Sequence, residues 1–238
     1  ILSKRGKLQA GEFVFTGTNT PIDIINALSS SAYAYRFITV TEGMSVKQVI
    51  RVLKNTSHLE GNLTSIPNEG FILPETYAYT LGENRQDVLN RMVLEMEKLL
   101  KQINIEFFNN PYIKNHKDLL TLASLVEKET GVADERAEIA GVYLNRLNLN
   151  MPLQCDPTVI YGMAQGEKLE RQLTRTDLQT YTPYNTYTNK GLPPGPIACP
   201  GKKAILAVLS PTQTQNLFFV ANGTGGHSFA KDLNGHNK

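Results

Sequence analysis

Leu119 to Glu129 reads LLTLASLVEKE, and Thr-Gly follows. Apolar residues recur there every three or four positions, a spacing that predicts an amphipathic helix ending near the glycine. At about 100° per residue, Glu129 falls on the apolar face, one turn beyond Val126. The same geometry turns Glu127 and Lys128 toward solvent, so we expect these two charges to be surface groups.

The predicted burial of Glu129 should change the acidity of its carboxyl group. Removal from water disfavours the charged form, raises the pKa and lets the group keep its proton near neutral pH. A general acid needs that property, so we expect Glu129 to be catalytic. The alternative is a helix that frays before Gly131, so that the carboxylate simply reaches water.

Length and composition are typical of a globular chain. For 238 residues, one large domain or two unequal domains are expected, and 41% hydrophobic residues argue against disorder. The 24 basic residues nearly balance the 22 acidic ones, which argues against a nucleic-acid partner. No apolar run is long enough to cross a membrane. The chain starts at Ile1, so we expect any membrane anchor to lie upstream of it.

Neither histidines nor cysteines predict a metal site. The four histidines form no HxxxH or HExxH pair, and Cys155 and Cys199 show no CxxC spacing. Phosphate-loop and nucleophile-elbow motifs are also missing from the sequence. We therefore expect no metal and no cofactor.

We expect an α+β fold with two domains, residues 1–62 and residues 63–238. The small domain contains two copies of a strand–turn–helix unit, one starting at Phe13 and one at Phe37, with Ser45 as the cap of the second helix. Such a unit buries little core alone, which favours a docking or recognition role. Amphipathic patterns predict further helices over residues 83–103, 117–129 and 134–147.

From about residue 150 to 201 the sequence becomes rich in Pro, Gly, Thr, Tyr and Asn, and long loops of this kind are usually functional. Gln154, Asp156 and Thr158 alternate with bulky neighbours, as one polar face of an extended strand does. An amide, a carboxylate and a hydroxyl in a row suit a sugar chain. The alternative is a turn in which Asp156 caps its own backbone.

Two later segments also suit carbohydrate. The run Tyr184-Asn185-Thr186-Tyr187 offers ring faces and hydrogen-bonding groups. The stiff Gly/Pro run that follows, which includes Pro194, can wall a groove.

Near the C-terminus, residues 217–221 predict a buried strand, and Asn222-Gly223 predicts a turn that leads to His227. We expect Asn222 and His227 to complete the rim of the site. A structural role for the lone histidine is the alternative.

Taken together in chain order, these motifs resemble the YceG-like (MltG) family of endolytic murein transglycosylases. The motifs that carry the resemblance are GFILPETY at 70–77, VEKET at 126–130, NRL at 145–147, LQCDPTVIYG at 153–162, YNTY at 184–187, GLPPGPIACPG at 191–201 and GGHSF at 225–229. They cover most of the chain. The N-terminal strand–turn–helix repeat is similar to the LysM-like subdomain of the family, a fold associated with glycan binding.

The resemblance implies a bacterial inner-membrane protein with a single upstream transmembrane helix and this portion on the periplasmic side. Its substrate would be nascent peptidoglycan strands, cut between N-acetylmuramic acid and N-acetylglucosamine to leave a 1,6-anhydro-muramyl end, and peptidoglycan synthases would be its partners. The second Glu of the family's EKE motif maps to Glu129, the residue that the helix geometry also selects. We predict that the substrate-binding residues are Asn145, Gln154, Asp156, Thr158, Tyr184, Asn185, Thr186, Tyr187, Pro194, Asn222 and His227.

The number of carboxylates decides between mechanisms. A glycosidase that hydrolyses its substrate generally uses two, whereas a lytic transglycosylase manages with one, as acid and then as base. Two alternatives stay open: a muramidase-type hydrolase that uses Glu129 with Asp156, and a peptidoglycan-binding protein without catalysis.

Overall fold

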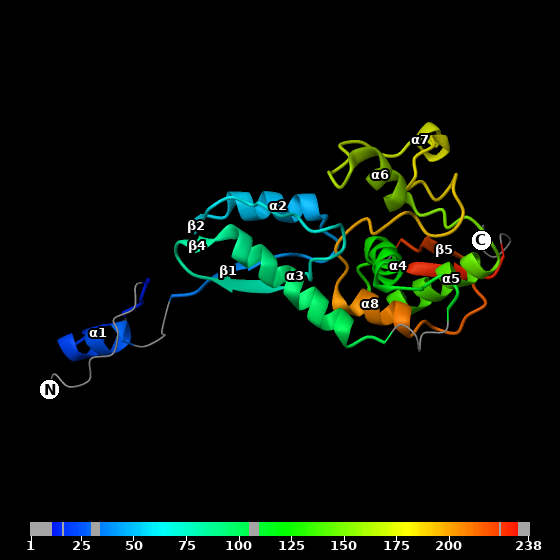
Figure 1. The fold of residues 1–238 in the computed structure, drawn as a ribbon. Coiled ribbons are helices and arrows are strands. Elements are labelled where there is room, and N and C mark those ends of the chain that lie inside the picture. Colours follow the sequence, from blue (N-terminus) through cyan, green and yellow to red (C-terminus); the bar gives the residue numbers. More distant parts are fainter. Residues whose placement is uncertain (1–10, 16, 30–33, 105–109, 224, 233–238) are drawn as a thin grey trace.

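The computed structural model describes residues 11–15, 17–29, 34–104, 110–223 and 225–232. Over these residues the chain has the expected α+β fold. Figure 1 shows a smaller and a larger unit joined by the long helix α3, with helix α1 set apart at the N-terminal end.

The smaller unit combines two short strand pairs with helix α2. β1 (Arg36–Thr39) pairs antiparallel with β3 (Thr76–Tyr79), and β2 (Leu59–Glu60) pairs parallel with β4 (Glu83–Asn84). α2 (Val46–Asn55) begins at its predicted capping box, in which Ser45 and Gln48 exchange hydrogen bonds between side chain and backbone.

Each strand pair joins a segment before residue 62 to a segment after it. The core of the smaller unit does the same, because Leu53 and Leu59 pack there with Tyr77 and Met92. The elements of the smaller unit therefore continue past residue 62. A glycan-binding, LysM-like role for residues 1–62 stays a prediction.

Helix α3 (Arg85–Lys101) ties the two units together. The apolar residues whose spacing predicts this helix are all buried: Val88, Leu89, Met92, Met96, Leu99 and Leu100. Met92 belongs to the core of the smaller unit, whereas Met96 and Leu100 belong to the core of the larger one. One amphipathic helix thus supplies both cores, with its axis running from one unit into the other (Figure 1).

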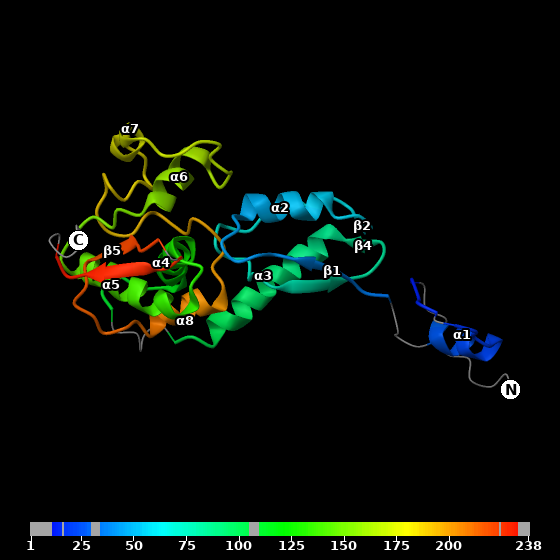
Figure 2. The ribbon, with the colours of Figure 1, turned by 180° about the vertical axis from the view of Figure 1, so that it is seen from behind.

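The larger unit is built on three helices that pack on one another. α4 (His116–Glu129) and α5 (Arg136–Asn148) confirm two predicted helices, and both contact α8 (Lys202–Leu209). The remaining elements are the 3-10 turn η2 (Ala133–Glu135), α6 (Asp156–Ala164), α7 (Arg175–Gln179), β5 (Phe218–Ala221) and β6 (His227–Ala230). Figure 2 shows the β5–β6 hairpin from behind, beside α5. The rings of Phe219, on β5, and Tyr143, on α5, meet edge to face.

The expectation of a strand at residues 13–15 was wrong, and so was the expected burial of residues 217–221. Residues 13–15 form no strand, because β1 takes its partner from residues 76–79, further along the chain. Helix α1 (Pro21–Leu28) of that first unit does form, but it buries none of its residues. β5 forms as predicted but is only partly buried, because its residues line a cavity.

A long connection also joins the two units. The backbone of Cys199 exchanges hydrogen bonds with the smaller unit, accepting from Gly43 N at 3.0 Å and donating to Met44 O at 2.7 Å. The Cys199 side chain is fully buried in the smaller unit's core. Among the described residues, no helix is both long and apolar enough to cross a membrane.

Candidate active site

Glu129 is the last residue of α4, and its carboxyl group lies half-buried where α4 meets α5. The Tyr143 hydroxyl, on α5, donates a hydrogen bond to Glu129 Oε1 at 2.7 Å. The buried Cys155 thiol also hydrogen-bonds to this carboxyl group. The helix geometry predicted that the Glu129 side chain points toward the protein and not into bulk water. The structure agrees, because the side chain is half-buried and hydrogen-bonds to protein groups.

Burial raises the pKa of Glu129. The hydrogen bonds from Cys155 and Tyr143 favour the carboxylate and oppose this effect, whereas the nearby charge of Asp156 adds to it. Burial also raises the pKa of Tyr143 well above its usual range, so the phenol stays a hydrogen-bond donor. The net result is a carboxyl group that keeps its proton more readily than an exposed glutamate.

A cavity of about 360 Å³ opens at Glu129. It gathers five of the predicted site residues, which come from separate stretches of sequence: Glu129, Gln154, Asp156, Tyr187 and His227. Strand β5 forms a further wall. The carboxyl group of Glu129 thus faces a space large enough for a bound molecule.

Helix α6 sets the position of Asp156, which is its first residue, with Pro157 second. The expected extended strand at residues 154–158 was wrong: Asp-Pro starts a helix here, since proline fits the first turn. Gln154 precedes the helix with a left-handed backbone (φ 52°). The Tyr187 hydroxyl donates to Asp156 Oδ1 at 2.6 Å, so these two predicted residues form one hydrogen-bonded pair at the cavity.

His227 reaches the cavity from the start of β6 and is held by Glu135. Its Nδ1 lies 2.7 Å from Glu135 Oε2, and its backbone N–H donates to Glu135 Oε1 at 2.7 Å. Burial of Glu135 works against ionisation, but the hydrogen bonds from His227 and Thr130 together lower the pKa of Glu135. A carboxylate bound at Nδ1 orients the imidazole ring.

Sequence reasoning missed Arg146, Tyr143 and β5 as parts of the site. Arg146 is almost fully buried, donates to the carbonyls of Leu153 (2.9 Å) and Leu217 (2.6 Å), and stacks over Phe218 at 5.1 Å. It thereby fixes the walls of the cavity. A charged residue on a helix otherwise rich in apolar residues was the available signal, since an arginine is seldom buried without partners.

Three predicted residues lie in a buried hydrogen-bond network instead of on the cavity wall. Thr158 and Thr186 share a hydrogen bond of 2.9 Å between their hydroxyls, and Thr186 also accepts from Cys155 N. Asn185 donates to the backbone carbonyls of Leu178 and Thr180. These side chains hold the loops in place, because segments poor in apolar residues depend on polar bonds for order.

The other predicted residues are dispersed. Asn145 donates to the carbonyls of Thr214 and Asn216 and lines a different hollow. Asn222 lies exposed at the hairpin turn, where its side chain accepts from Gly226 N at 3.2 Å. Tyr184 and Pro194 line a second cavity, which shares no residue with the first.

The solvent-facing role expected of Glu127 was wrong. Its side chain is only 3% exposed, accepts from Gly201 N at 2.9 Å and pairs with the buried Arg136 at 3.2 Å. Gly201 caps α8. Helix α4 is therefore covered on two sides, which a single helix pattern does not reveal.

The family model for the YceG-like family matches residues 1–238, the whole chain. The chain belongs to the YceG-like family. A relative from Bacillus subtilis (strain 168), named endolytic murein transglycosylase, is 36% identical over 247 residues, which cover 90% of this YceG-like chain and 67% of the relative.

Two pneumococcal relatives bear the same name. The one from Streptococcus pneumoniae serotype 2 (strain D39) is 38% identical over 165 residues, covering 66% of this YceG-like chain but only 29% of its own length. Among solved structures, a YceG-like protein from Listeria monocytogenes matches 91% of the chain and 80% of its own, with a TM-score of 0.71 and 27% identity. The fold described above is therefore similar to that of another YceG-like protein.

Proposed function

We propose that this chain is a lytic transglycosylase that cleaves peptidoglycan, with Glu129 as its single acid and base. The observation that carries the proposal is the half-buried Glu129 carboxyl group, which has a raised pKa and opens into a cavity. The relatives named endolytic murein transglycosylase supply the substrate class.

In the first step, the Glu129 carboxyl group donates its proton to the glycosidic oxygen, and the bond between that oxygen and C1 of N-acetylmuramic acid breaks. Positive charge develops at C1. The C6 hydroxyl of the same sugar then attacks C1, and the Glu129 carboxylate takes up the hydroxyl proton. The product has a 1,6-anhydro ring, no water is consumed, and Glu129 returns to its protonated state.

The groups around Glu129 have distinct roles in this proposal. Tyr143 and Cys155 hold the carboxyl group in place. Asp156, fixed by Tyr187, supplies negative charge near the positive charge that develops on the sugar. His227, at the start of β6 and oriented by Glu135, provides a hydrogen-bonding group at the cavity.

The substrate also implies a place of action. Peptidoglycan lies outside the inner membrane, so we propose that this portion acts there, held by an anchor upstream of residue 1 and working beside the synthases that make the strands.

Purified protein on isolated sacculi provides the test, with products resolved by mass. We expect anhydro-muramyl ends from the wild-type chain and none from Glu129→Gln, because glutamine keeps the shape but cannot donate and reclaim a proton. The matched control is Glu97→Gln, which changes an exposed glutamate on α3 and should retain full activity. Activity of Glu129→Gln above a trace level is incompatible with the proposed mechanism.

A hydrolase with Asp156 as second carboxylate is the other function that the cavity supports, because Asp156 lines it together with Glu129. The same product analysis separates the two. Free reducing ends would mean that water attacks C1, whereas anhydro ends require the C6 hydroxyl.

A further inference from the structure

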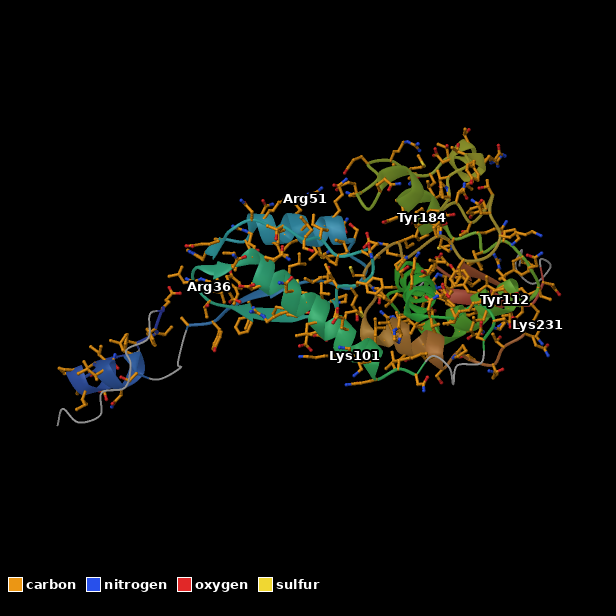
Figure 3. All side chains as sticks on the ribbon, in the orientation of Figure 1. Arg36, Arg51, Lys101, Tyr112, Tyr184 and Lys231 are labelled. Carbon is orange, nitrogen blue, oxygen red and sulfur yellow. The ribbon has the colours of Figure 1, made fainter. Side chains whose placement is uncertain are left out.

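A second cavity, of about 390 Å³, lies where the two units meet. We call it the tyrosine pocket. It shares no lining residue with the Glu129 cavity, and the residues that matter below are Glu69, Lys117, Tyr161, Tyr184, Pro194 and Pro196. Figure 3 labels Tyr184 beside α6, away from the β5–β6 hairpin that walls the Glu129 cavity.

Two aromatic rings dominate one wall of the pocket. The centroids of Tyr161, on α6, and Tyr184 lie 4.8 Å apart with the ring planes tilted by 55°. Both side chains are only partly buried, so ring surface remains open to the cavity. Aromatic walls with a few polar groups are typical of ligand sites, and the C–H face of a sugar ring fits such a wall.

Polar groups complete the pocket. Glu69 accepts a hydrogen bond from Val46 N at 2.8 Å and one from the Tyr161 hydroxyl at 3.3 Å. Burial raises the pKa of Glu69, so its carboxyl group holds a proton more readily than an exposed glutamate does, and the protonated form can donate as well as accept. The exposed ammonium of Lys117 has no ion pair or hydrogen bond within the described part of the chain. Hydroxyl and acetamido groups of a sugar can use both.

The pocket is preformed. Gly70 adopts a left-handed backbone (φ 84°), and a Cβ atom there would lie 2.6 Å from the Pro196 Cβ, so its backbone packs directly against the proline. Pro194 and Pro196 stiffen the chain segment that they contribute to the lining. A rigid site loses little conformational freedom on binding, which favours affinity.

Two segments connect the tyrosine pocket to the Glu129 cavity. α6 contributes Asp156 to the cavity and Tyr161 to the pocket, with the two α-carbons separated by roughly 7.5 Å along the helix axis, from a rise of 1.5 Å per residue. The loop after α7 contributes Tyr187 to the cavity and Tyr184 to the pocket. The two cavities are therefore neighbours along the same two segments.

We propose that the tyrosine pocket is a saccharide subsite that holds the glycan strand away from the bond that is cut. That the ligand is a glycan follows from the proposed function, on which this inference rests. A cut within a glycan strand leaves sugar units on both sides of the bond. A second binding site for those units would help the protein to bind the strand at an internal bond.

The test measures binding, so that it does not depend on cleavage. The probe is a β-1,4-linked N-acetylglucosamine hexasaccharide, titrated by calorimetry into the full chain carrying Glu129→Gln. In that background we expect Tyr184→Ala to weaken binding about tenfold, the loss of one aromatic contact. Lys117→Ala, which changes an exposed side chain and cannot unfold the core, should weaken it about three- to tenfold.

Tyr181→Ala is the matched control, because Tyr181 is 71% exposed and lines neither cavity. Binding should match that of the parent. Unchanged affinity in folded Tyr184→Ala and Lys117→Ala, or no binding of the hexasaccharide to the parent, overturns the subsite. Failure of the proposed function would appear elsewhere, as wild-type protein that releases no product from sacculi.

Discussion

Replacing Tyr143 by phenylalanine isolates the hydrogen bond that restrains Glu129. The ring is buried and meets Phe219 edge to face at 5.8 Å, and phenylalanine keeps both features. Only the hydroxyl, 2.7 Å from Glu129 Oε1, is lost. Because that hydroxyl favours the carboxylate, its removal makes the charged form less favourable and raises the pKa of Glu129 further.

The size of the effect follows from the bond. A hydrogen bond to a charged group contributes roughly 1.5–3 kcal/mol, and since Glu129 lines an open cavity, water replaces part of it. We take the lower end, which corresponds to about a tenfold change in proton affinity. In the proposed mechanism Glu129 must be protonated in the free enzyme, so the alkaline limb of kcat/KM should move to higher pH by about one pH unit.

The assay is the pH dependence of kcat/KM on soluble glycan strands, followed by release of anhydro-muramyl ends. Tyr77→Phe is the matched control, because it removes a hydroxyl that donates to Leu73 O at 2.6 Å in the smaller unit. Its profile should coincide with that of the wild type. An alkaline limb that stays in place, or moves to lower pH, in Tyr143→Phe would refute the assignment of Glu129 as the acid.

Three further outcomes are expected. Glu127→Ala should lower the free energy of unfolding by about 3–5 kcal/mol in urea denaturation, because it leaves the Arg136 charge buried without its closest partner; a change below 1 kcal/mol (about one ordinary hydrogen bond) would contradict this. Gly70→Ala should lower the free energy of unfolding by about 2–4 kcal/mol, because Gly70 has a left-handed backbone and the added Cβ would clash with Pro196. Gly191 has a similar backbone (φ 82°) but open space around it, so Gly191→Ala should lower the free energy of unfolding by only about 1–2 kcal/mol in the same assay. Asp156→Asn should slow release of product from sacculi about tenfold to a hundredfold by removing a charge near the developing cation, while every product end remains anhydro by mass; reducing ends would place Asp156 in the bond chemistry.

Local patterns predicted those parts of the fold that depend on neighbours along the chain. The capping box of α2, the apolar stripe of α3 and the position of Glu129 on α4 all follow from spacing of three or four residues, which one helix encodes by itself. The gathering of Gln154, Asp156 and His227 around Glu129 was expected from their chemistry, and the cavity contains all of them.

Tertiary packing decided the parts that sequence patterns missed. Glu127 lies on the polar side of its own helix, but Arg136 and the start of α8 cover that side. Thr158 and Asn185 are residue types that often bind sugars, but here they hydrogen-bond to other residues of the protein. A pattern of polar residues gives the bonding capacity of a segment and leaves open whether a ligand or the backbone uses it.

The attachment of Cys199 to the smaller unit has a consequence for biosynthesis. Met92 and Cys199 share one core, but the ribosome delivers the second about a hundred residues after the first, which takes roughly 5–20 s. Until then, the core of the smaller unit lacks the Cys199 side chain and the Met44 carbonyl lacks its donor. The N-terminal unit therefore matures late, and a fragment truncated before the 191–201 segment should emerge as a loosened, protease-sensitive body.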